Sequence, residues 1–181
     1  VLSAITAGGT ALLRLGTSIG AGPDIAPAAD VGDTFGTALI APLGENTLAT
    51  IRSSIGDGLA GPQDVDLYAV DLVAGDRVVL DWRTAGYLGV VRVFDPAGAE
   101  VAEWVLPDEF ADLAFVAAST GSYRIGVSGA FNIDYDPVTG AGEAAFATGD
   151  YELGLSRTGA GSARLTAIEA VADSGTPARG A

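Results

Sequence analysis

Cysteine, histidine, methionine and lysine are absent from this sequence of 181 residues, and its nine basic residues are all arginine. Without cysteine and histidine the chain cannot form disulfide bonds, a zinc site of thiolates and imidazoles, or a Ser-His-Asp or Cys-His catalytic group. The metal ligands that remain are oxygen atoms, which suit calcium. The composition therefore argues against the common nucleophilic and zinc enzymes and leaves calcium as the expected cofactor.

Basic residues are also few beside the acidic ones, because 23 aspartates and glutamates give a net charge of −14. Nucleic-acid binding is not expected, since phosphates require a basic surface. No apolar run reaches the roughly 18 residues of a membrane span, and the sequence starts at Val1 rather than at a methionine. We expect a secreted or cell-surface protein, processed or cut from a longer chain, that is not an enzyme.

The chain lacks long apolar runs. Its apolar residues lie in short alternating stretches, which its 26 glycines and 8 prolines separate. A period of two with such turn residues between the runs is typical of an all-β sandwich. The prediction is an all-β, two-sheet antiparallel β-sandwich, jelly-roll-like, with extended N- and C-terminal arms. Its strands are expected at residues 47–54, 65–72, 77–83, 88–94, 101–106, 112–117, 123–128 and 151–156. Residues 107–118 form the one stretch that could hold a helical turn.

The two ends of the chain resemble each other, since residues 11–38 and 151–181 both contain a strand, a Gly-Ala-Gly linker and an acidic, small-residue segment. A true repeat would mean tandem domains, because its period of about 140 residues is longer than that of a solenoid. The alternative is chance similarity in a sequence rich in alanine and glycine. We assign residues 1–27 to an N-terminal arm or the end of a preceding module, 28–158 to the sandwich domain, and 159–181 to a C-terminal linker or the start of a next module.

Six short motifs follow one another along residues 28–158. They are an acidic opening at Asp30 and Asp33, then Asp64-Val-Asp66-Leu-Tyr68, Ala74-Gly75-Asp76, Asp95-Pro-Ala-Gly98, Gly121-Ser-Tyr123 and Gly149-Asp-Tyr151. In this order they resemble the bacterial pre-peptidase C-terminal (PPC) domain, which is related to the collagen-binding modules of collagenases. The resemblance implies a β-sandwich without catalysis that assists secretion or binds polymeric substrates and matrix proteins.

The resemblance also implies a calcium site between the acidic opening and the aspartate that precedes the strand tyrosine. Asp30, Asp33 and Asp66 match ligand positions of the family. Two further family positions fall on Ala28 and Gln63, which are poor or absent ligands for calcium. Asp64 or Asp57 are the possible substitutes.

Calcium is expected on physical grounds as well. Asp57, Asp64 and Asp66 lie close together in the sequence, and carboxylates gathered without lysine repel one another unless a cation lies between them. The alternative is a solvated acidic edge that discourages pairing with other strands. The predicted metal ligands are therefore Asp30, Asp33, Asp57, Asp64 and Asp66.

A second acidic segment alternates oxygen side chains at Asn132, Asp134 and Asp136, like the start of an EF-hand loop. Pro137 interrupts that pattern, and Glu143 at the twelfth position is not followed by a helix pattern. A long hairpin loop with local Asx turns is favoured, and long loops on a rigid sandwich often carry recognition.

Acidic residues near aromatic ones raise one enzymatic alternative. A glycosidase could use Glu103, Asp108 or Glu109 beside Trp104, but so small a domain is not expected to form a deep cleft. Trp82 is predicted to lie in the core, whereas Trp104 lies either in the core or on an exposed platform. Three tyrosines at strand starts are expected to place their hydroxyls at a sheet rim: Tyr68, Tyr123 and Tyr151.

Two functions follow from these observations. The first is a calcium-binding extracellular module that serves as an accessory or adhesion domain of a larger secreted or surface protein and binds a protein or a polysaccharide. The second is a self-assembling subunit of an extracellular filament or surface layer, in which the arm at residues 4–18 adds a strand to another copy of the chain.

Overall fold

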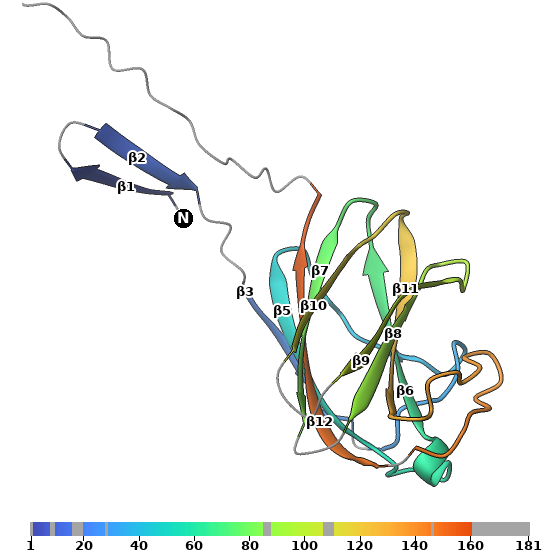
Figure 1. Ribbon diagram of the computed structural model, residues 1–181. Helices are drawn as coiled ribbons and strands as arrows, with labels where there is room; N and C mark the ends of the chain where they lie inside the picture. Colours follow the sequence, from blue (N-terminus) through green and yellow to red (C-terminus); the bar gives the residue numbers. More distant parts are fainter. Residues whose placement is uncertain are drawn as a thin grey trace, which may run out of the picture. The chain divides into compact units, whose positions relative to one another are not determined.

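The computed structural model describes residues 2–7, 10–15, 20–27, 29–84, 88–106, 111–145 and 147–160. The chain divides into two units, Ile19–Gly161 and a second that comprises Val1–Ser18 with Ser162–Ala181. The larger unit is a β-sandwich of two five-stranded sheets that face each other (Figure 1). The predicted fold class is confirmed.

Each predicted strand is present, with bounds shifted by at most two residues. The strands are β5 (Thr47–Ile55), β6 (Val65–Leu72), β7 (Arg77–Thr84), β8 (Gly89–Phe94), β9 (Glu100–Leu106), β10 (Ala111–Val116), β11 (Gly121–Gly129) and β12 (Gly149–Thr158). The turns between them use glycine as expected, since Gly75 and Gly98 have φ values of 89° and 85°. Because β10 occupies residues 111–116, the helical turn considered for 107–118 is wrong over those residues.

Two further strands come from the segment that precedes β5. The strand β3 (Gly20–Ile25) runs parallel to β5, and the two-residue β4 (Leu39–Ile40) runs parallel to β6. The sheets have the strand orders β10-β7-β12-β5-β3 and β4-β6-β11-β8-β9. Their other pairings are antiparallel, so each sheet is antiparallel except at one edge. Neither β3 nor β4 shows an alternating pattern, which is why the sequence did not predict them.

The main core lies between the two sheets. Trp82, Leu80 and Leu153 come from one sheet, and Val70 and Ile125 come from the other; all five are fully buried. Trp82 therefore lies where it was predicted. Trp104 packs against this core and stays half-buried, so it is not an exposed platform.

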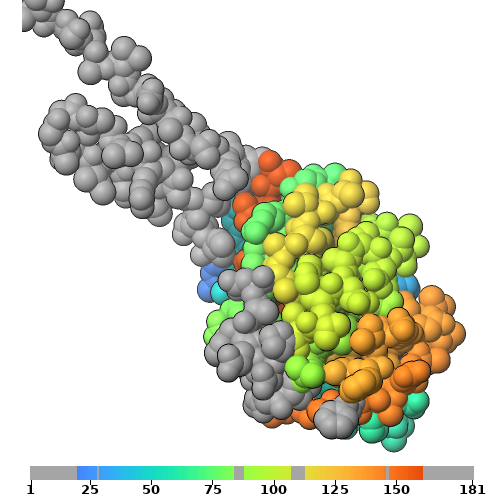
Figure 2. All heavy atoms as spheres, in the orientation of Figure 1, coloured from blue at the N-terminus to red at the C-terminus, as the bar shows by residue number. Residues whose placement is uncertain are grey.

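A second, smaller core covers the outer face of the sheet that contains β6. It consists of Val65, Leu67, Phe94 and Tyr135, with Phe35 packed against it. Phe35 belongs to the segment at residues 29–38, which we call the lead-in segment. Tyr135 belongs to residues 130–148, which we call the long loop and which Figure 2 shows in orange beside the yellow-green residues of β8 and β9. This second core explains why both faces of β6 are buried.

The N-terminal residues were predicted to form an extended arm. In the structure these residues contain a hairpin, in which β1 (Leu2–Ala7) pairs antiparallel with β2 (Thr10–Leu15). Whether they are an arm or the end of a preceding module stays a prediction. Residues 161–181, which contain most of the predicted C-terminal linker, lie outside the described residues. Within the described part of the chain no helix has the length and apolarity that a membrane span needs.

Candidate metal centre

The structure brings together three of the five aspartates that the sequence singled out. Asp30 lies in the lead-in segment, Asp64 ends the loop before β6, and Asp66 is the second residue of β6. One carboxylate oxygen of each lies within 4.8 Å of those of the other two. A set of oxygen ligands this close can coordinate one hard cation.

The other two predicted aspartates lie beside this group. The Asp33 carboxylate accepts a hydrogen bond from the Val65 backbone N–H at 3.2 Å. Asp57 and Asp30 interact through their side chains. Neither Asp33 nor Asp57 belongs to the three-carboxylate group itself, and both add negative charge around it.

A glycine makes room for the Asp30 carboxylate. A Cβ atom at Gly58 would lie 1.7 Å from Asp30 Oδ2, so any side chain there would displace the carboxylate. The loop between β5 and β6 therefore approaches the lead-in segment through its backbone. This close approach places Asp30 near Asp64, which lies just before β6, and near Asp66, which lies in β6.

Two oxygen atoms of the group are buried without a partner. Asp64 and Asp66 are both 0% exposed, and Asp64 Oδ1 and Asp66 Oδ1 have no hydrogen-bond donor among the described residues. The other Asp64 oxygen accepts a hydrogen bond from the Gly56 backbone N–H. In that same part of the chain the arginines that form ion pairs use other carboxylates. A buried carboxylate oxygen without a donor is costly unless a cation compensates it.

Burial also changes the acidity of these groups. It raises the pKa of Asp64 to about 7, with Asp30 and Asp33 adding to the effect and the Gly56 N–H opposing it. Burial raises the pKa of Asp66 to about 8, against a hydrogen bond from Tyr151. The pKa of Asp30 is raised as well, first by burial and then by Asp57 and Asp33. Without a cation the group therefore favours bound protons at neutral pH.

Two tyrosines connect Asp66 to the interior. The Tyr151 hydroxyl, from the opposite sheet, donates to Asp66 Oδ2, and the Tyr68 and Tyr151 hydroxyl oxygens are 2.6 Å apart. Tyr151 also stacks on Trp82 with ring centroids 5.2 Å apart. The prediction that these hydroxyls lie at the sheet rim is wrong, because both tyrosines are buried. The period of two does place Tyr68 and Asp66 on one face of β6, which was the available signal.

The long loop is fastened to the same end of the sandwich. The buried Asn132 side chain donates to the Gln63 carbonyl at 2.9 Å, and the Gln63 side chain donates to the Gly142 carbonyl at 2.9 Å. Asp136 forms the expected Asx turn, because its carboxylate accepts from the Val138 N–H at 2.8 Å. Asn132 thus anchors the loop through its side-chain nitrogen, Asp136 forms a local turn, and the Gln63 side chain fastens the loop to the end of the sandwich.

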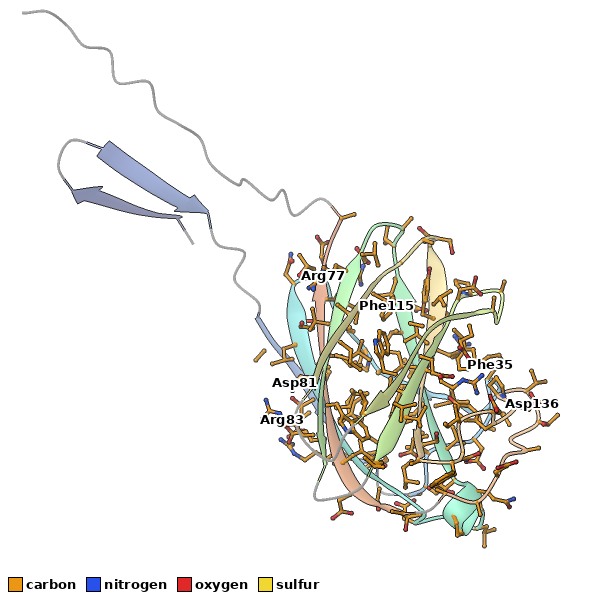
Figure 3. The ribbon with its side chains drawn as sticks, in the orientation of Figure 1. Phe35, Arg77, Asp81, Arg83, Phe115 and Asp136 are labelled. Carbon is orange, nitrogen blue, oxygen red and sulfur yellow. The ribbon has the colours of Figure 1, made fainter. Side chains whose placement is uncertain are left out.

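A groove of about 560 Å³ runs along the outer face of β5, β7 and β12 and borders the acidic group through Asp57 and Tyr151. Arg52 in this groove pairs with Asp24 and with Glu152. Arg83 pairs with Asp81, as Figure 3 shows on the side of the sandwich opposite Phe35.

The residues proposed for a glycosidase do not form a described site. Glu103 on β9 lies 4.0 Å from the Arg92 guanidinium, which also pairs with Glu100 at 2.6 Å. Asp108 and Glu109 lie outside the described residues.

The fold and this centre define a β-sandwich domain with a candidate metal centre at one end. No protein-family model and no curated protein matches the chain. Among solved structures, the pre-peptidase C-terminal domain of a collagenase from Bacillus anthracis is 18% identical, with a TM-score of 0.44, over 65% of this chain and 93% of its own. A periplasmic inhibitor of g-type lysozyme from Aeromonas hydrophila is 14% identical, with a TM-score of 0.43, over 75% and 99%. A surface-associated copper-binding protein of Methylomicrobium album is 11% identical, with a TM-score of 0.42, over 66% and 98%. A PPC domain is thus among the structures that this chain resembles, and membership of that family remains a prediction.

Proposed function

We propose that this protein is a non-catalytic, extracellular β-sandwich binding module that holds a calcium ion at the group formed by Asp30, Asp64 and Asp66. The observation that carries the proposal is a pair of buried oxygens, Asp64 Oδ1 and Asp66 Oδ1, that have no hydrogen-bond partner in the described part of the chain. They belong to a group in which one oxygen of each carboxylate lies within 4.8 Å of the others. A hard divalent cation such as calcium satisfies such oxygens.

Electrostatic repulsion supports a bound cation. At 4.8 Å and with an effective dielectric constant of about 20, two full negative charges repel each other by about 3.5 kcal/mol. Three pairs of such charges would strongly oppose folding in the ionised form. A calcium ion between the carboxylates reverses the sign of this contribution.

The proposed ion has a mechanical role. Calcium takes six to eight oxygen ligands, so the three aspartates leave positions for water and for further protein oxygens. Asp33 and Asp57 are candidates for two of them, directly or through water. Because the ligands come from the lead-in segment and from the start of β6, the ion would fasten one to the other.

The module's partner is proposed as a protein or a polysaccharide. The groove beside the acidic group supports this part of the proposal, since it offers charged and hydroxyl groups on the outer face of β5 and β12. The absence of histidine and cysteine supports a binding role over nucleophilic catalysis. An extracellular location agrees with a cation site suited to calcium-rich surroundings.

Self-assembly is a second candidate function. It is favoured by the hairpin of β1 and β2, because a two-stranded sheet by itself is marginally stable and gains from a third strand. Gel filtration tests it: calcium-dependent polymers that vanish when residues 1–18 are deleted would support assembly, and a monomer under all conditions would exclude it.

Calorimetric titration of the chelator-treated chain with calcium tests the metal site directly. We expect one site in the wild type and at least tenfold weaker binding in Asp66→Asn. Asp71→Asn is the matched control, because Asp71 is an exposed residue of the same strand and the charge change is identical. Absence of binding by the wild type, or equal binding by both variants, would end the calcium proposal.

A further inference from the structure

Arg124 is an arginine without a carboxylate partner in an otherwise acidic protein. Arg52, Arg83, Arg92 and Arg157 each form an ion pair. The guanidinium of Arg124 forms none with the described residues, although the chain has 23 acidic residues and only nine arginines. Arg77 likewise forms no ion pair with the described residues, but it is exposed, whereas Arg124 is half-buried. A half-buried guanidinium without a carboxylate is unexpected in a chain whose charge is mostly of the opposite sign.

The backbone holds this guanidinium in place. Arg124 lies in β11, and its Nη1 donates to the Ser122 carbonyl at 3.1 Å and to the Tyr123 carbonyl at 3.4 Å. Its Nε is buried without an acceptor among the described residues. One edge of the planar fork is therefore fixed and the Nε–H is shielded from solvent, so the terminal N–H groups are the donors left for a ligand.

Arg124 lines a pocket of about 320 Å³ on the outer side of the second core. The pocket also has an apolar wall made by Phe35, Pro96 and Val138. These residues come from the lead-in segment, the β8–β9 turn and the long loop, which meet here; Figure 3 shows Phe35 and Asp136 of the long loop on the same side of the sandwich. Val138 is 68% exposed, so the pocket opens to solvent.

The one carboxylate that lines this pocket, Asp95, uses one of its oxygens in the adjacent turn. Asp95 Oδ1 accepts hydrogen bonds from the Ala97 and Ala99 backbone N–H groups, both at 2.9 Å. It therefore serves the turn between β8 and β9 and does not pair with Arg124. The pocket thus combines an available cationic fork with apolar walls.

We propose that this pocket binds the carboxyl end of a polypeptide whose last side chain is apolar. Arginine recognises a carboxylate through two parallel hydrogen bonds, and Phe35, Pro96 and Val138 would contact the side chain beside it. The volume lies at the small end of the range for ligand sites, which suits one terminal residue rather than a large molecule. The net charge of −14 repels any carboxylate, that of the proposed ligand included, and the guanidinium is the group at this pocket that can offset the repulsion. The proposal does not depend on the calcium site.

Nuclear magnetic resonance of the ¹⁵N-labelled chain tests the proposal. The probe is the dipeptide N-acetyl-Ala-Leu with a free carboxylate, compared with the same dipeptide as the C-terminal amide and with acetate. We expect saturable shifts of the backbone amides of residues 97–98 and 122–124 with the free dipeptide, with a dissociation constant on the order of 1 mM. The amide and acetate are expected to bind at least tenfold more weakly. Equal binding by the amide would refute recognition of the carboxylate, and equal binding by acetate would refute recognition of a peptide end.

Two variants assign the effect to the pocket. Arg124→Gln should weaken binding at least tenfold, and Arg77→Gln, which removes an exposed arginine from the other sheet, should leave it unchanged. Val138→Asp places a competing carboxylate on the exposed wall without disturbing the core, and it should also weaken binding at least tenfold. Unchanged binding in Val138→Asp, with the spectrum of a folded protein, would overturn the proposal even if Arg124→Gln fails to fold.

Discussion

Saturating calcium should raise the melting temperature of this protein substantially, because the ion binds only the folded arrangement of Asp30, Asp64 and Asp66. At a free calcium concentration 100 times the dissociation constant, a single site stabilises the folded state by about 2.7 kcal/mol. For a chain of this size one kcal/mol corresponds to roughly 2–4 °C, so the expected rise is about 5–11 °C. Differential scanning calorimetry in calcium and in chelator measures it.

The Asp66→Asn variant sharpens the prediction, because its effects in calcium and in chelator have opposite signs. In chelator the variant should melt above the wild type, since the amide is neutral at every pH, whereas folding without metal must either protonate the Asp66 carboxyl or bury it charged beside Asp64 and Asp30. In calcium it should melt below the wild type, because a ligand has been lost. Asp71→Asn should follow the wild type in both conditions. A wild type that melts at the same temperature with and without calcium, or an Asp66→Asn variant with the full calcium shift, would refute the reasoning.

Three further outcomes are expected. The raised pKa values of the two buried aspartates, about 7 and about 8, mean that the folded state without metal binds more protons than the unfolded state, whose value is near 3.8. Stability in chelator should therefore fall as the pH rises from about 4 to about 8, and saturating calcium should flatten this pH dependence. Urea unfolding midpoints at pH 5 and pH 8 measure the dependence. A higher midpoint at pH 8 than at pH 5 in chelator would contradict the prediction. Tyr151→Phe removes a buried hydroxyl that donates to Asp66 and should cost about 1–3 kcal/mol of unfolding free energy, so an unchanged urea midpoint would argue against the hydrogen bond. Gly58→Ala should weaken calcium binding at least tenfold by displacing Asp30. Gly36→Ala is the control and should bind calcium like the wild type, because the nearest atom is 3.9 Å from the added Cβ. Equal calcium affinities of the two variants would show that Asp30 is not a ligand.

Much of the sandwich could be predicted from the sequence because strands are encoded locally. Alternation with a period of two and glycine turns indicate the strands β5 to β12 without any reference to long-range contacts. The two parallel edge strands could not be predicted in this way. The hydrogen bonds of β3 and β4 to β5 and β6 depend on where the chain runs, and neither segment has a pattern of its own.

The acidic group of Asp30, Asp64 and Asp66 could likewise be predicted only in part from the sequence. The sequence by itself determined the absence of other metal ligands and the density of aspartates around residues 57–66, which depend only on composition and order. Only the tertiary structure decided that Asp30, Asp64 and Asp66 converge, that Tyr151 reaches Asp66 from the opposite sheet, and that Arg124 lies in a pocket made by three distant segments. The physical reason is that a strand's periodicity specifies which face a side chain takes but carries no information about which distant residue packs against that face.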